Sequence, residues 1–277
     1  MLPGASVAPQ RVYIEAGLGR TPRTSPWAMT EPERLSRAPI VEAALSINTV
    51  LPDSVNQETL ASFQERLGGR YPTKEVRMVW SGQVEMKPAD TPQITTTSGG
   101  PSGYIFRSAD NRQAVQALRQ GFTFSRFKPY QDWDTFSREA RDLWSRYATL
   151  AKPEKVTRIG LRYINRLDLP LPFNDFKEYL LTVPEIAPGL PQGLASFFFR
   201  VVIPVDKAEA FAIITETIVE GEESKGVVPV ILDIDVFRTG AFPIVADKLW
   251  PAFDRLRELK NDLFFKTLTD KAKDLFK

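Results

Sequence analysis

The chain has 277 residues, of which 43% are hydrophobic and 25% are charged, a composition typical of globular proteins with a substantial core. Its 36 basic and 34 acidic side chains give a formal net charge of +2, so no global field would hold nucleic acid or an anionic membrane. Histidine and cysteine are absent from the sequence, which excludes disulfides, Ser-His-Asp and Cys-His catalysis, and zinc sites built from either residue.

Residues 1–38 are rich in proline and show no sustained hydrophobic period, which predicts a disordered tail. Met29 opens a stretch that resembles an ordinary start, so upstream sequence outside the functional protein is an equally weighted interpretation. We predict a single domain over residues 39–277.

Two features of the composition bear on location. We find no run of about 18 apolar residues that would span a bilayer and no secretory signal, and the lack of cysteine fits a reducing compartment. We therefore expect a cytoplasmic protein without membrane contact.

The first half begins with alternation, because residues 41, 43, 45 and 47 are apolar and residues 42, 46 and 48 are polar, which predicts a half-buried strand. A helix over 58–67 should end at Gly68. Extended segments follow at 75–87, 103–109 and 114–127, with 88–102 between the first two and GGPSG at 99–103 as a flexible hairpin connection. Apolar and aromatic residues at helical spacing then predict a long helix over about 133–150.

The second half shows a similar order. A strand is expected at 156–169, a short helix near 176–181, strands at 196–205, 211–220 and 228–237, and a long C-terminal helical region. Pro251 should confine the regular helix largely to the residues that follow it.

The repeated order predicts an α+β fold with an internal duplication. Each half, 39–152 and 153–277, would contribute a strand, a helix, three strands and a long helix. We expect a mostly antiparallel, curved sheet with the long helices packed on one face and the other face open.

The most distinctive stretch is RIGLRYINRLDLP, in which Arg158, Arg162 and Arg166 share one strand face. In LDIDVF, Asp233 and Asp235 project from one side of an otherwise apolar strand. If the two strands are neighbours, arginine can reach aspartate, and Glu42 of the first strand is expected to join them.

This charged face has two interpretations that the sequence leaves open. One is a structural ion-pair ladder, and the other is a groove that binds a ligand or partner. An alternative function is a metal-assisted phosphohydrolase or nucleotide-processing enzyme, with Asp233 and Asp235 on Mg²⁺ and Arg162 and Arg166 on phosphate. Phe122, Phe124 and Arg126 share a face that would suit nucleic acid, but alternating Phe residues favour a core.

The segments PIVEA at 39–43, LRYINR at 161–166 and LDIDVF at 232–237, followed by a C-terminal FF-K-T-LTD segment, resemble the sporadically distributed bacterial family of uncharacterised proteins. The resemblance covers residue 39 to the C-terminus and transfers no catalytic residue or cofactor. A patchy distribution implies, by analogy, a role accessory to bacterial defence or in a toxin-antitoxin or immunity pair.

We therefore predict a non-catalytic binding protein that recognises a protein partner or a small anionic ligand, without a cofactor or metal and without nucleic acid. The predicted binding residues are Glu42, Arg162, Asn165, Arg166, Asp233 and Asp235.

Overall fold

The structure is a computed structural model that describes residues 35–85, 93–219 and 226–277, with the main chain alone described at 80–85, 93–98 and 207. Arg34–Lys277 form one compact unit. The predicted tail lies outside the described residues apart from its last few. Among these, the backbone N–H of Arg37 donates to the carbonyl of Phe276, so the chain just before the first strand contacts the C-terminal segment.

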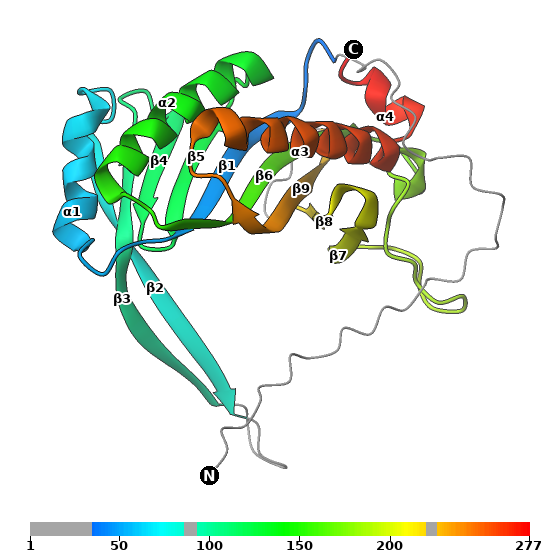
Figure 1. The fold of residues 1–277 in the computed structure, drawn as a ribbon. Coiled ribbons are helices and arrows are strands. Elements are labelled where there is room, and N and C mark those ends of the chain that lie inside the picture. The colour runs from blue at the N-terminus through cyan, green and yellow to red at the C-terminus, as the bar shows by residue number, and fades with distance from the viewer. Residues whose placement is uncertain (1–34, 86–92, 220–225) are drawn as a thin grey trace. The chain divides into compact units, whose positions relative to one another are not determined.

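The described residues of the unit form nine strands and four α-helices, with three short 3₁₀ helices between them (Figure 1). In chain order these are β1 (Ile40–Val50), α1 (Gln57–Ala61), β2 (Thr73–Glu85), β3 (Gln93–Arg107), β4 (Gln113–Leu118), β5 (Gly121–Phe127), α2 (Trp133–Ala151), β6 (Lys155–Pro170), β7 (Phe198–Val205), β8 (Ala210–Ile218), β9 (Val227–Phe242), α3 (Ala246–Thr267) and α4 (Asp270–Asp274). The expected α+β class is confirmed.

All nine strands form one antiparallel sheet in the order β2-β3-β4-β5-β1-β6-β9-β8-β7. The first strands of the two halves, β1 and β6, pair with each other near its centre. Each then pairs with the last strand of its own half, β5 or β9.

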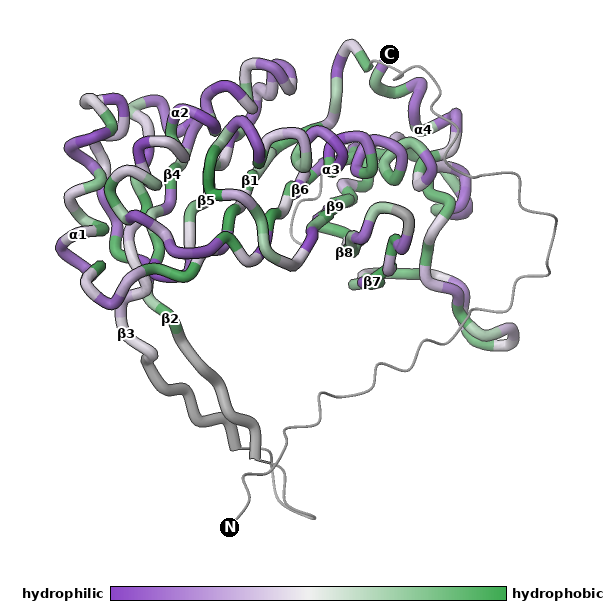
Figure 2. Tube along the Cα trace, viewed as in Figure 1, coloured by the Kyte–Doolittle hydropathy of each residue, from purple (hydrophilic) through white to green (hydrophobic). Residues whose placement is uncertain are grey.

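Alternation along the central strands gives the sheet two different faces. In β1, Ala43, Leu45 and Ile47 are fully buried, whereas Glu42 and Ser46 on the other face are half-exposed. Helix α2 contacts β5, and α3 contacts β6 and β9, on the buried face. Figure 2 shows the hydrophobic stretches along these strands. We call the sheet face opposite α2 and α3 the open face.

Asp132 caps the N-terminus of helix α2, where its side chain accepts a hydrogen bond from the backbone N–H of Thr135. The predicted aromatic stripe faces the sheet, where Phe136 stacks on Phe124 with ring centroids 5.2 Å apart. The indole N–H of Trp133 donates to Asp254 of α3. Both Phe122 and Phe124 are buried, so the core interpretation of that strand is confirmed.

Most of α3 follows Pro251, as expected, but its first turn lies before the proline and the helix runs through it. Proline in a helix interior costs roughly 3 kcal/mol. Leu249 and Trp250, which directly precede it, are buried, and burial of a large apolar side chain contributes roughly 1.5–3 kcal/mol each. Packing of this turn therefore offsets the cost. No described helix is both long and apolar enough to cross a membrane.

Three other boundaries differ from expectation. The segment expected as one strand over 114–127 is the hairpin of β4 and β5, turning at residues 119–120. The connection expected over 88–102 is strand from residue 93 onward, because backbone pairing with β2 tolerates GGPSG through two register shifts. The short helix expected near 176–181 is a single 3₁₀ turn at Phe176–Glu178.

Gly121, at the start of β5, lies in close contact with the backbone of the neighbouring strand β1. Its φ is +142°, and an added Cβ would lie 2.1 Å from the carbonyl oxygen of Ile47. We expect Gly121→Ala to lower the free energy of unfolding by about 3 kcal/mol or more in urea titration, because both backbone strain and a backbone clash oppose it.

Gly68→Ala is the matched control, since Gly68 also has a positive φ of +63° but nothing within 4 Å of an added Cβ. It should cost about 1 kcal/mol. Equal losses for the two variants would show that the clash is absent.

Candidate functional site

The candidate site lies on the open face of the three central strands β1, β6 and β9. The register places Ala44 and Asp235 on either side of Arg162, and Glu42 and Asp233 on either side of Ile164. Opposite residues of antiparallel strands point to the same face, so the predicted arginine and aspartate side chains do come together. We call Arg158, Arg162, Asp233 and Asp235 the charged cluster.

Arg162 and Asp233 form the more exposed pair of the cluster. The Arg162 Nε lies 2.9 and 3.1 Å from the two Asp233 carboxylate oxygens, and its Nη2 lies 2.6 Å from Oδ2. This forked contact has the geometry of a strong charge-assisted pair, and it raises the pKa of Arg162. The Arg162 side chain is 50% exposed and Asp233 13% exposed, so the guanidinium remains accessible from solvent.

Arg158 and Asp235 form the second pair, and it is packed more tightly. The Arg158 Nη2 donates to Asp235 at 3.2 Å and its Nη1 donates to Ser46 Oγ at 3.1 Å, while the guanidinium lies over the Phe237 ring at 4.3 Å. Gly160 makes room for this arrangement, because a Cβ there would lie 2.7 Å from Arg158 Nη1. Arg158 is therefore held on three sides.

Partial burial changes the acidity of this pair. Desolvation raises the pKa of the Asp235 carboxyl, and the nearby Arg158 charge opposes the rise without cancelling it. The Asp235 and Arg158 side chains are each 24% exposed. The open face thus combines an accessible pair with a half-buried one.

The other predicted residues take different places. Glu42 lies on the open face, where its charge contributes to the raised pKa of Arg162, but among the described residues it makes no ion pair. Asn165 lies on the opposite, buried face and donates to the carbonyl of Leu232 at 3.0 Å. Its inclusion in a binding surface is therefore wrong, because strand alternation turns it away from Arg162 and Arg166.

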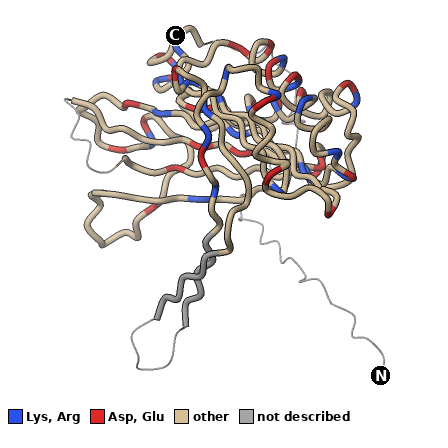
Figure 3. The backbone as a smooth tube through the Cα atoms, turned by 90° about the vertical axis from the view of Figure 1, so that its left-hand side faces the viewer, with Lys and Arg blue, Asp and Glu red and all other residues tan. Residues whose placement is uncertain are grey.

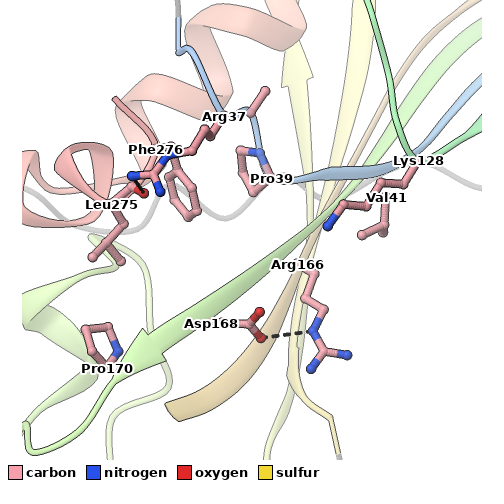
Figure 4. Close-up of a pocket in the computed structure, with 10 residues that line it drawn as sticks. Arg37, Pro39, Val41, Lys128, Arg166, Asp168, Pro170, Leu275 and Phe276 are labelled. Carbon is pink, nitrogen blue, oxygen red and sulfur yellow. Dashed lines mark hydrogen bonds and ion pairs between the residues drawn. The ribbon is translucent and has the colours of Figure 1, made fainter. Parts of the chain in front are cut away.

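Arg166 lies on the open face farther along β6, at a depression of about 320 Å³ (Figure 4). Its Nε donates to Asp168 at 2.9 Å. Lys128 and Arg37 from two other segments also line the depression, so three cations surround it with one carboxylate. A register shift between Ile40 and Glu42 in β1 adjoins this site, as bulges often adjoin binding sites.

The sequence did not predict that Ser46, Phe237 and Gly160 belong to the site. It placed Arg158 on the charged strand face, but Arg158 was not among the predicted binding residues. The even spacing of Arg158, Arg162 and Arg166 was a sufficient signal for Arg158. The contributions of Ser46 and Phe237 depend on the register between three strands, which alternation within one strand does not give.

The carboxylates of the cluster are engaged by arginine. Asp233 binds Arg162 and Asp235 binds Arg158, so a cation at either carboxylate would have to displace a guanidinium. Within the described parts of the chain, no three Asp or Glu side chains gather as potential metal ligands.

Two buried titratable groups lie on the helix side of the sheet. Glu216 of β8 has no exposed surface, neither of its carboxylate oxygens has a described hydrogen-bond partner, and burial raises its pKa from 4.5 to about 8. Lys260 of α3 places its ammonium 3.9 Å from the Tyr163 ring centroid, and burial lowers its pKa from 10.5 to about 7. Neither belongs to the open face.

Comparison with known proteins gives no assignment, since no family model matches the sequence and no curated protein matches it significantly.

A double-mutant cycle measures the half-buried pair. We expect Arg158→Ala and Asp235→Ala to show a coupling free energy of about 1–2 kcal/mol, because each partner is largely withdrawn from water. Arg146 and Asp142 of α2 are an exposed comparison pair, with 41% and 46% exposure, in which Asp142 also contacts Arg70 at 3.2 Å, and they should couple by about 0.3–0.5 kcal/mol. Urea titration of the wild type, the four single variants and the two double variants checks both values, and equal couplings would contradict the structure.

Glu216 predicts a pH dependence of stability. In the folded protein its pKa is about 8, above the ordinary 4.5. The protonated carboxyl therefore causes no pH-dependent loss of stability below pH 4.5, and the free energy of unfolding falls as the pH rises from 4.5 towards 8. We expect Glu216→Gln to remove this loss. The difference in free energy of unfolding between the variant and wild type should then grow in favour of the variant by about 1 kcal/mol per pH unit across that interval. Parallel pH profiles would refute the prediction. Glu154→Gln, at an exposed carboxylate, is the control.

Proposed function

We propose that this protein is a non-catalytic binding protein whose open sheet face recognises a protein partner. The observation that carries the proposal is the charged cluster, in which two neighbouring ion pairs leave the Arg162 guanidinium half-exposed at the centre of the sheet. Arginine with aromatic neighbours is enriched at the energetically important centres of protein interfaces.

The geometry of the cluster favours recognition over reaction. Arg158 is held by Asp235, Ser46 and Phe237, and Arg162 is held by a forked contact with Asp233. Side chains fixed in this way lose little conformational entropy on binding, which preorganises the surface.

The balance of charge favours a protein partner over nucleic acid. Arg158, Arg162 and Arg166 are matched on the open face by Glu42, Asp233 and Asp235, and Figure 3 shows basic and acidic residues interspersed over the unit. A phosphate backbone is bound mainly through excess positive charge, which such a surface does not supply.

An anionic group of the partner would find its place beside Arg166. Lys128 and Arg37 lie around the same depression, and Val41 and Phe276 give it apolar walls. A carboxylate carried on an apolar stem suits this combination of charge and lining.

We further propose membership of the sporadically distributed bacterial family, a cytoplasmic location and an accessory role in defence or immunity. In support, the three resembling segments fall on the neighbouring strands β1, β6 and β9, of which β6 and β9 carry the charged cluster. We also propose the internal duplication. The pairing of β1 with β6 and the long helix that ends each half support it, although the first half has one strand more.

Exchanging the two charges of the Arg162–Asp233 pair distinguishes a role in partner binding from a purely structural role. We expect Arg162→Glu combined with Asp233→Arg to keep the melting temperature within a few degrees of wild type, because the pair is restored with reversed polarity. The field presented to a partner is also reversed, so partners captured from the native source by wild type should be lost. Quantitative mass spectrometry of the captured proteins measures the loss.

Arg146→Glu combined with Asp142→Arg, the same exchange on the exposed pair of α2, is the control and should retain every partner. If the exchanged Arg162 and Asp233 protein also retained all of them, the cluster would be a structural ladder and the proposed function would fail.

A further inference from the structure

Among the described residues, strand β7 pairs with β8 alone, so it is an edge of the sheet. Its sequence, FFRVVIPV, places large apolar side chains in solvent. Phe198 is 71% exposed, Val202 is 50% exposed and Ile203 is 38% exposed. Edge strands usually carry charges that discourage pairing with other chains, so an apolar edge of this length indicates a surface that is covered in use.

The apolar surface of β7 continues towards the charged cluster. The register aligns Val202 with Ile213 of β8, and Pro204 with Phe211, which in turn stacks on Phe237. Phe237 also lies beneath the Arg158 guanidinium. The β7 edge and the charged cluster are thus parts of one continuous face.

One charge interrupts the apolar character of β7. Arg200 is exposed on the open face opposite Thr215, and among the described residues it has no carboxylate partner. It is also the one charged residue in the strand, so a second copy paired through β7 would bring no carboxylate of its own strand to meet it. Pro204 lacks a backbone N–H, which leaves residues 198–203 as the pairing segment.

We propose that β7 accepts an extended segment of a partner protein as a tenth strand, with an acidic side chain facing Arg200 and apolar side chains beside Phe198 and Val202. Backbone hydrogen bonds along the edge supply affinity, and the acidic residue sets register and specificity. The inference rests on the proposed recognition function and assigns the chemistry of the partner. An acidic residue flanked at i−2 and i+2 by β-branched apolar residues is the pattern it recognises.

A synthetic strand peptide tests the proposal directly. The probe is a fluorescein-labelled heptapeptide, Thr-Val-Thr-Glu-Thr-Val-Thr, and its matched control carries Lys in place of Glu. We expect fluorescence anisotropy to show the Glu peptide binding the full chain about tenfold more tightly than the Lys peptide. Arg200→Glu should invert that preference. Equal binding of the two peptides, or an unchanged preference in Arg200→Glu, would overturn the proposal.

A second peptide tests the backbone pairing. Two versions of the Glu peptide, each N-methylated at alternate residues along one edge, separate strand addition from side-chain contact. Methylation of the edge that faces β7 should abolish binding, and methylation of the other edge should not. Retention of binding by both versions would overturn strand addition.

Light scattering over a range of protein concentrations tests whether a second copy of the chain, rather than a partner segment, covers β7. A dimer that Val202→Lys dissociates would show that a second copy covers β7 and would overturn the proposal. Failure of peptide binding, combined with partner loss in the Arg162 and Asp233 exchange, would reject strand addition alone. Peptide binding with no effect of that exchange would reject the proposed function of the charged cluster.

Discussion

The antiparallel pairing of β1 with β6 is the contact on which the rest of the structure depends. These strands come from different halves of the chain, and each brings one further strand of its own half beside it. The same register decides which residues point to the helices and which to the open face. A slip of one residue would turn Arg162 inward and Tyr163 outward, so burial of the core enforces the position of the charged cluster.

The two ion pairs differ because their surroundings differ. Arg158 and Asp235 sit between Ser46 and the Phe237 ring, where desolvation is strong enough to raise the Asp235 pKa despite the adjacent cation. Arg162 and Asp233 keep contact with water through the guanidinium. The first pair is therefore half-buried between neighbouring strands, whereas the second keeps its guanidinium exposed to solvent.

Sequence reasoning succeeded where a local period determines the outcome. The alternation of β1 and the helical spacing of α2 predict those elements closely, because burial of one face selects apolar residues at every second or every third to fourth position. It failed at the GGPSG segment and did not place the first turn of α3 before Pro251, because local propensity argues against regular structure at both. Packing of Leu249 and Trp250, and pairing of β3 with β2, outweighed those propensities.

The sequence by itself determined the chemistry available to this protein. Without histidine or cysteine, the titratable side chains available to the open face are limited to carboxylates, guanidinium groups, ammonium groups and tyrosine hydroxyls, and the spacing of Arg158, Arg162 and Arg166 already places them on one side of a strand. Only the tertiary structure decided which arginine meets which aspartate, that Asn165 is buried, and that β7 is an edge. Each of these depends on register and strand order, which are set by contacts between residues far apart in the chain.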